Sequence, residues 1–501
     1  MRRLSILFFF AVTVVVAPNG LAAKCIRGNC LNGYGVMTLS GGEKYSGQWK
    51  NGKFDGQGVY TFSSGKKYIG QWLQNQRCGQ GTMTYNNGDQ YNGHWRNGKH
   101  HGYGVMHFIS GQVYTGHWEN GVINGNGAMN DSDGKQYSGE WQDGQLNGQG
   151  TLIFPSGAKY TGLWLNGAQN GHGSMLYADG GQYTGDWKDG ERFGQGTLRL
   201  ANGQTYTGQW RKDVFDGQGT MLFANGDVYV GEWKDGKFCG HGIMNFDKGK
   251  QYTGGWKKGK FHGYGTMKFA NGDKYDGDWV MGSIKGKGVM QYYDGRRYSG
   301  QWNDNRHNGH GVMHFADGSE YDGHWENGNF EGQGAMLFPD GAKYDGHWKN
   351  DNFEGQGTML FPDGKKYSGN WSANKYNGRG TFVHSDGQKY KGDWKNGVRE
   401  GQGVMVYPNG SKYAGQWHKS KRNGKGTMTF NDGSKYTGNW KNGKLNGHGT
   451  MLYADGKKYV GQWKNDNCNG KGTLLFHGGR TYKGVWKNGQ LVKRTNKKRK
   501  N

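Results

Sequence analysis

Proline and cysteine are scarce in this chain of 501 residues, which contains only five of each. Hydrophobic residues make up 33% of it and the mean hydropathy is -0.98, so the chain is too polar for several thick cores. Its aromatic content of 15% is nevertheless too high for a disordered protein. Acidic residues are also in the minority, with 39 against 64 lysines and arginines. The formal net charge of +25 therefore indicates attraction to anionic surfaces.

Twenty tryptophans stand 23 residues apart, from Trp49 to Trp486, and no tryptophan lies elsewhere. Each follows a tyrosine by four residues and a glycine by two, as in Tyr45-Ser-Gly47-Gln-Trp49. A fixed period of this length indicates an array of stacked structural repeats. Such an array presents the same surface many times, whereas a catalytic site needs unlike residues that converge on one point. We therefore expect a binding or structural protein and no enzymatic activity.

Each repeat shows two segments in which residue types alternate with a period of two. Tyr68, Gly70 and Trp72 alternate with other residues in the first segment, and residues 79–85 continue the alternation in the second. This period predicts two short strands, each with one apolar face. Glycines within the strands are explained if the rings of Trp and Tyr lie across bare backbone.

The connections between the strands are short and rich in turn residues. A glycine recurs at the first connection, mostly after Asp or Asn, and we expect this pair to supply the positive φ angles of a tight hairpin turn. The third residue after tryptophan is Gly in thirteen repeats and Asn, Asp or Ser in the other seven. Four prolines share one position, just before the first turn: Pro155, Pro339, Pro362 and Pro408. Short connections predict antiparallel strands, hence an all-β fold: an elongated, twisted, single-layer sheet of stacked 23-residue β-hairpins.

The spacing of Tyr45, Gly47, Trp49, Gly56 and Gly58 resembles the MORN repeat. The resemblance covers residues 33–491 and implies an elongated sheet of hairpins that serves as a scaffold. It also implies phospholipid recognition, which some members of that family are linked to. The predicted structural core of the repeat is Tyr45, Gly47, Trp49, Gly56, Gly58, Tyr68 and Trp72.

The first 23 residues have the pattern of a secretory signal peptide. A basic start precedes an apolar run at 4–16, and a small-residue cleavage site ends at Ala23. We expect the mature protein to be secreted or periplasmic and to have no transmembrane segment. In such a compartment Cys25 and Cys30, within the segment 24–32, are close enough to form a disulfide. The three other cysteines, which are seven or ten repeats apart, are expected to be unpaired with one another: Cys78, Cys239 and Cys468.

Basic residues recur on the strand face opposite the rings. The residue before tyrosine is lysine in six successive repeats: Lys343, Lys366, Lys389, Lys412, Lys435 and Lys458. Equivalent residues of neighbouring repeats should form a row about 10 Å apart, which fits an anionic surface. The alternative is that the lysines only keep a thin sheet soluble. Acidic residues interrupt the pattern before this stretch: Glu320, Asp322, Glu326, Glu331 and Glu354. The residues 492–501 form a basic tail, for which we expect disorder.

Three functions other than lipid-surface binding remain to be weighed. A protein partner would use the same extended sheet. A carbohydrate or cell-envelope polymer would require exposed aromatic ladders, whereas buried rings would simply form the core. We expect no catalytic residues, cofactor or metal, since polar residues recur without converging, and the histidines that precede tryptophan in adjacent repeats lie too far apart to share an ion. Nucleic acid is not expected as a partner, and a homo-oligomer stays open.

Overall fold

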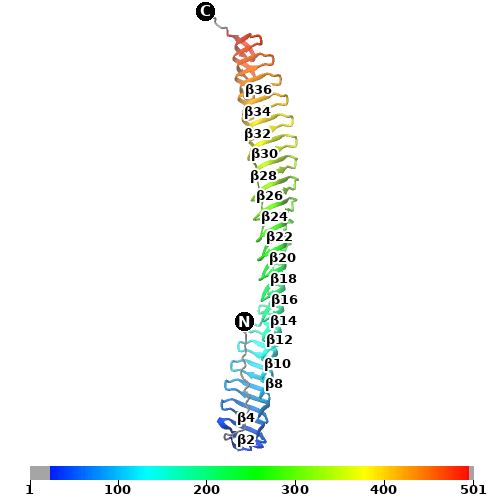
Figure 1. Cartoon of the computed structure of the whole chain (residues 1–501), viewed down its shortest axis with the longest axis vertical. Helices are drawn as coiled ribbons and strands as arrows, with labels where there is room; N and C mark the ends of the chain where they lie inside the picture. Colours follow the sequence, from blue (N-terminus) through cyan, green and yellow to red (C-terminus); the bar gives the residue numbers. More distant parts are fainter. Residues whose placement is uncertain (1–22, 496–501) are drawn as a thin grey trace. The chain divides into compact units, whose positions relative to one another are not determined.

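The computed structural model describes residues 23–495 and contains β-strands, two short 3-10 turns and no α-helix in that range (Figure 1). The predicted all-β hairpin architecture is confirmed. The described chain divides into two compact units. Unit 1 comprises residues 23–248 and 256–260, and unit 2 comprises residues 249–255 and 261–495.

The strands of unit 1 follow one another in chain order. They are β1 (Lys24–Gly28), β2 (Gly33–Thr38), β3 (Lys44–Lys50), β4 (Lys53–Thr61), β5 (Lys67–Leu73), β6 (Gln76–Thr84), β7 (Gln90–Arg96), β8 (Lys99–His107), β9 (Val113–Glu119), β10 (Val122–Asn130), β11 (Gln136–Gln142), β12 (Gln145–Ile153), β13 (Lys159–Leu165), β14 (Ala168–Leu176), β15 (Gln182–Lys188), β16 (Glu191–Arg199), β17 (Thr205–Arg211), β18 (Val214–Leu222), β19 (Val228–Lys234) and β20 (Lys237–Asn245). Each pairs antiparallel with the next. The turn η1 (Ser40–Gly42) precedes β3, and η2 (Asp247–Gly249) and β21 (Gln251–Lys257) lie where the chain passes between the units.

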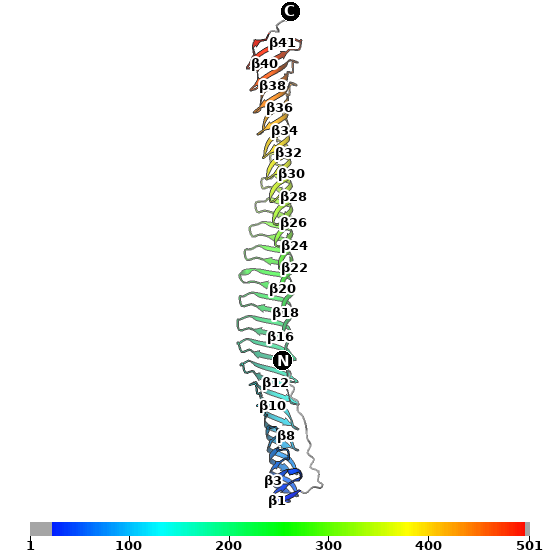
Figure 2. The ribbon, with the colours of Figure 1, turned by 90° about the vertical axis from the view of Figure 1, so that its left-hand side faces the viewer.

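Unit 2 repeats the same arrangement (Figure 2). Its strands are β22 (Lys260–Lys268), β23 (Lys274–Val280), β24 (Ser283–Gln291), β25 (Arg297–Asn303), β26 (Arg306–His314), β27 (Glu320–Glu326), β28 (Asn329–Leu337), β29 (Lys343–Lys349), β30 (Asn352–Leu360), β31 (Lys366–Ser372), β32 (Lys375–Val383), β33 (Lys389–Lys395), β34 (Val398–Val406), β35 (Lys412–His418), β36 (Lys421–Thr429), β37 (Lys435–Lys441), β38 (Lys444–Leu452), β39 (Lys458–Lys464), β40 (Asn467–Leu475), β41 (Thr481–Lys487) and β42 (Gln490–Arg494). Antiparallel pairing again joins each strand to the next.

The core of each repeat forms where tyrosine lies across a glycine pair. In β29 and β30, Gly346 stands directly opposite Gly357. A Cβ on Gly357 would lie 2.3 Å from the Tyr344 hydroxyl oxygen and 2.6 Å from its ring. The tyrosine hydroxyl donates to the carbonyl of His347, three residues further along the same strand, at 2.9 Å. The glycines are therefore needed for space, as the sequence predicted.

Tyrosine and tryptophan rings form a continuous edge-to-face series within the described repeats of unit 2. Tyr344 contacts Trp348 of its own repeat at 5.2 Å between centroids and Trp371 of the next at 5.4 Å. The indole of Trp371 donates to the Gly357 carbonyl at 3.2 Å. Edge-to-face pairs of this kind are worth about 0.5–1.5 kcal/mol beyond burial. Each repeat is thus tied to its neighbour by rings as well as by the strand ladder.

The two connections use different turn chemistry, which corrects one prediction. In the turn that follows β30, only Gly364 has positive φ, at 83°, while the Asp363 carboxylate accepts the backbone N–H of Lys365 at 3.1 Å. Aspartate is therefore selected there for a side-chain hydrogen bond and not for a left-handed conformation. The connection after tryptophan is the one with two successive positive φ values, as in Asn51 (52°) and Gly52 (73°).

The array extends further at both ends than the sequence indicated. Residues 24–32 contribute β1, which pairs with β2, and the sulfurs of Cys25 and Cys30 are bonded to each other. At the other end β42 includes Arg494, whose guanidinium lies 4.4 Å from the Tyr482 ring. This part of the expected disordered tail is therefore ordered, because the last tyrosine and the β41 ladder offer it a partner. The predicted signal peptide and residues 496–501 lie outside the described residues, apart from Ala23. The three remaining cysteines are free thiols.

Candidate functional site on the polar face of unit 2

The polar face of a strand carries the residues that alternate with the buried tyrosine, glycine and tryptophan. In unit 2 these side chains fall into rows that run from strand to strand, because successive repeats have the same register, including the same irregularity between glycine and tryptophan. The row nearest the proline-containing turns holds the six predicted lysines. A middle row lies two residues further along each strand, and a third row two residues beyond that.

The six lysines, here called the basic row, are all exposed. The row consists of Lys343, Lys366, Lys389, Lys412, Lys435 and Lys458. None of them forms an ion pair with a residue that the structure describes. By contrast, the adjoining Lys365 and Lys457 are paired with Asp363 and Asp455 at 2.6 and 2.7 Å. The charges of the basic row are thus directed to solvent.

Aliphatic side chains separate the lysines of the basic row, a feature that the sequence analysis missed. Lys366, for example, stands opposite Leu360 on one side and Val383 on the other. The same alternation runs along the row through Leu337, Leu360, Val383, Val406, Leu452 and Leu475, and is interrupted once, by Thr429 between Lys412 and Lys435. Leu360 is 43% and Leu452 44% exposed. In this row, residues that are 6 or 17 positions apart in the sequence lie opposite each other on neighbouring strands. This register therefore places lysines and aliphatic residues side by side.

Four of the five acidic residues that interrupt the basic pattern have structural partners. The Glu331 carboxylate accepts the backbone N–H of Asn350 at 3.0 Å, and that of Glu354 accepts the N–H of Ala373 at 3.1 Å. Both carboxylates thereby hold the turn of the following repeat. Asp322 lies 3.3 Å from a ring nitrogen of His310, and Glu320 lies 3.0 Å from one of His314. These engaged carboxylates therefore do not form a row of free negative charges that would compete for the lysines of the basic row.

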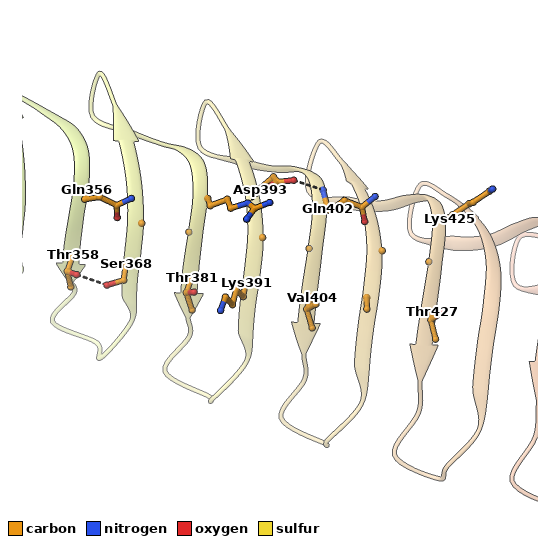
Figure 3. Close-up of a pocket in the computed structure, with 18 of the residues that line it drawn as sticks. Gln356, Thr358, Ser368, Thr381, Lys391, Asp393, Gln402, Val404, Lys425 and Thr427 are labelled. Carbon is orange, nitrogen blue, oxygen red and sulfur yellow. Dashed lines mark hydrogen bonds and ion pairs between the residues drawn. The ribbon is translucent and has the colours of Figure 1, made fainter.

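A groove of about 1520 Å³ follows the middle and third rows, from Gln333 in β28 to His448 in β38. Figure 3 shows one row with Thr358, Ser368, Thr381 and Thr427 and a second with Gln356, Asp393, Gln402 and Lys425. Glycine backbone, as at Gly380 and Gly403, forms part of the lining. No tyrosine, tryptophan or phenylalanine is among its lining residues.

Some charged side chains of the groove are engaged by other residues, and others are free to bind a ligand. The Asp393 carboxylate accepts the backbone N–H of Gln402 at 2.8 Å and lies 3.7 Å from the Arg379 guanidinium, whose side chain is 92% exposed. Lys391 and Lys425 line the same groove, and neither forms an ion pair with any described residue. Between Arg379 and Lys425 the accessible charge of the groove is therefore positive, whereas Asp345 places a carboxylate nearer its other end.

The residue opposite each tryptophan is a further core position, which the sequence analysis did not single out. Phe353 fills it beside Trp348, His100 beside Trp95 and Arg77 beside Trp72. His100 stacks on Tyr91 with centroids 3.8 Å apart, and burial lowers its pKa to about 3. Variable residue type hid the position, although its constant distance of five residues from tryptophan is visible in the sequence.

The aromatic ladders are not available for carbohydrate. Tyr344 is 1% and Trp348 3% exposed, and the other predicted core rings Tyr45, Trp49, Tyr68 and Trp72 are also buried. Burial likewise raises the pKa of Tyr344 well above its usual value. The alternative that required exposed ring ladders is therefore wrong, because the rings are used to cover the glycines and to join neighbouring repeats.

Neither a metal centre nor a membrane-spanning helix is found in the described part of the chain. No group of three or more His, Cys, Asp or Glu residues there is arranged to hold a metal ion. Residues 23–495 likewise contain no helix of the length and apolarity needed to cross a bilayer.

Comparisons with curated sequences and with solved structures give no information about function. A comparison with curated protein sequences finds no significant match. Solved structures include the TCP domain of Drosophila melanogaster SAS-4, at 14% identity over 35% of this chain and 90% of that one, with a TM-score of 0.21. The TCP10 domain of Danio rerio CPAP matches at 16% identity over 48% and 96%, with a TM-score of 0.16. Scores this low carry no argument about function.

The family comparison is decisive, because the MORN repeat model matches nineteen segments from 45–67 to 459–479 that succeed one another along nearly the whole of that range. The chain therefore belongs to the MORN-repeat family and consists almost wholly of these repeats.

Proposed function

We propose that this protein is a non-enzymatic, secreted or periplasmic MORN scaffold whose basic row binds an anionic phospholipid surface. The observation that carries the proposal is the alternation of six unpaired lysines with mostly aliphatic side chains in unit 2, five of which are exposed leucines or valines. Lysine charges attract phosphate headgroups, and the aliphatic side chains between them can enter the headgroup region.

The expected strength follows from many small contributions. A lysine near an anionic membrane is worth about 1 kcal/mol, and this falls with distance over the Debye length. Because the six lysines are held on one rigid strand ladder, contact by one brings the others near the same surface, and their contributions add. A solubilising role alone would need neither this register nor the aliphatic residues between the lysines.

Co-sedimentation with anionic and neutral vesicles at low and high salt tests the proposal. The variant replaces all six lysines of the basic row by glutamine. A matched control removes equal charge by replacing six exposed lysines at the far ends of the same strands or, for Lys375 and Lys421, at the start of the following strand: Lys349, Lys375, Lys395, Lys421, Lys441 and Lys464. We expect binding to anionic vesicles alone, weakened by salt, lost in the basic-row variant and largely retained in the control.

Two results would contradict the proposal. Equal loss in both variants would mean that only net charge matters and that the row has no special role. Absence of binding to either kind of vesicle would exclude the lipid surface and leave a protein partner as the function of the scaffold.

A further inference from the structure

The groove beside the basic row has the dimensions of a site for a single polymer chain. Its lining spans eleven strands, β28 to β38, which corresponds to roughly 50 Å at about 4.8 Å per strand. Glycine backbone forms part of its surface between two rows of side chains. A flat bilayer resting on the basic row would not enter such a hollow, so the groove calls for a thinner ligand than the proposed membrane surface.

The chemistry of the groove restricts how that ligand is held. Backbone N–H and C=O groups of the eleven strands are used in the antiparallel ladder, so an added peptide strand finds no main-chain partner on this face. Without a tyrosine, tryptophan or phenylalanine in the lining, and with a single histidine at one end, the groove has no series of rings on which successive bases could stack. Besides the carboxylates of Asp345 and Asp393, the groove offers hydroxyl, amide and cationic side chains, which suit a ligand rich in hydroxyl groups and carboxylates.

The offered groups recur with the repeat. The position of Thr358 is filled by Thr381, Val404 and Thr427 in the following repeats, and that of Gln356 by Arg379, Gln402 and Lys425. Equivalent positions are two strands, or about 10 Å, apart. An extended β-1,4-linked polysaccharide repeats its disaccharide at nearly this distance, so each repeat of the protein can meet the same groups of the ligand. A peptide of irregular sequence would not match such a ladder.

Charge selects among polysaccharides. Lys391 and Lys425 are unpaired among the described residues, Arg379 is nearly fully exposed, and Asp393 is engaged by Gln402 and Arg379. We infer that the groove binds one extended chain of an anionic, uronic-acid polysaccharide, with the lysines contacting carboxylates and the Thr, Ser and Gln side chains contacting hydroxyls. This site is distinct from the phospholipid contact of the basic row and goes beyond the proposed function.

The test is calorimetric titration of the full chain with β-1,4-linked oligomannuronates of graded length at about 0.15 M salt. A methyl-esterified oligomer keeps the sugar backbone and removes its charge, while polyaspartate and single-stranded DNA of similar length keep charge without the sugar. The variant is Lys391→Gln with Lys425→Gln. Its matched control is Lys395→Gln with Lys421→Gln, two exposed lysines of the same repeats outside the groove lining.

We expect affinity to rise with oligomer length until the groove is filled, and to fall by about tenfold or more in the groove variant, as the loss of two charge-assisted contacts implies. The control should change by less than about twofold, since two distant charges contribute only screened attraction. The groove variant should still bind anionic vesicles like the wild type, which separates this site from the basic row.

Three results would overturn the inference. The first is equal binding of the methyl ester, and the second is equal weakening of both lysine variants. The third is binding of polyaspartate or single-stranded DNA as tight as that of the uronate, which would assign the groove to general polyanion attraction.

Discussion

At the scale of single residues, the seven repeats that lack glycine at the third position after tryptophan have a residue there that makes a hydrogen bond of its own. Asn374 has φ of 63°, and its side-chain oxygen accepts the backbone N–H of Phe353 in the preceding repeat at 2.7 Å. All seven residues of this kind make the equivalent bond: Asn75, Asp213, Asn305, Asp351, Asn374, Ser420 and Asp466. Where glycine is absent, the side chain thus joins two repeats.

Substitutions at Asn374 separate the two roles of that residue. Asn374→Gly loses the hydrogen bond but keeps the left-handed turn, so we expect a loss of about 1 kcal/mol in the free energy of unfolding. Asn374→Ala loses both, at a further cost of about 1 kcal/mol or more. Urea unfolding measures the difference, and equal stability of the two variants would show that the turn imposes no left-handed strain.

Buried histidines make stability depend on pH. Burial lowers the pKa of His100 to about 3 and of His307 to about 4, with nearby Arg77 and Arg296 as the second cause, while each has the ordinary histidine value when unfolded. The unfolded chain therefore binds more protons below about pH 6.5, and the folded state loses stability as the pH falls from there toward the folded pKa values. Well above about pH 6.5, both histidines are neutral in the folded and the unfolded chain, and the stability of the folded state no longer depends on their titration.

The measurable consequence is a loss of about 2 kcal/mol per histidine between pH 7 and pH 5. Phenylalanine occupies the same position in several repeats, so His100→Phe with His307→Phe should fold and remove that part of the pH dependence. Urea unfolding at the two pH values checks this. An unchanged pH dependence in the double variant would show that other groups cause it.

At the scale of the hairpin, packing depends on contact between a ring and bare backbone. Gly357 does not have positive φ, so alanine there meets no backbone strain and its cost is steric alone. Thr358 is the next residue on the same strand and faces the groove. The two positions therefore compare the two faces of one strand.

Gly357→Ala should lower the free energy of unfolding by about 1–3 kcal/mol, because its Cβ overlaps the Tyr344 ring. Thr358→Ala should stay within about 1 kcal/mol, the loss of one hydroxyl bond to Ser368. Thermal and urea unfolding provide the measurement. A Gly357→Ala variant as stable as Thr358→Ala would mean that the ring moves aside freely.

At the scale of the whole molecule, each repeat offers a ligand only a weak contact, but the contacts of many repeats add to a large binding free energy. No single lysine of the basic row is expected to be essential, which is why the tests above remove a complete row or a pair within one groove. The first and last described strands each have only one strand neighbour among the described residues. Both carry basic residues, Lys24 and Arg27 in β1 and Lys493 and Arg494 in β42, so like charges oppose end-to-end pairing of copies.

Much of this fold could be predicted from the sequence alone. The period of 23 located every repeat, alternation around Tyr68 and Trp72 predicted both strands, and the glycines opposite tyrosine predicted close ring contact. These signals are local, since side-chain direction in a strand and backbone freedom in a turn depend on neighbouring residues. The candidate lysines were visible for the same reason, because one position recurs in successive repeats.

Other features were decided by tertiary structure. Cross-strand register placed Leu360 and Val383 beside Lys366, and curvature of the sheet turned the polar face into a groove, neither of which a one-dimensional period contains. Alternation of rings with polar residues shows that the rings share one face, but not whether that face is exposed. Packing of neighbouring repeats decides this, and it buries Trp348 and Tyr344. The sequence by itself thus determined the repeat and its strands through short-range geometry. The tertiary structure decided which surfaces remain for ligands, because that depends on contacts between residues of different strands.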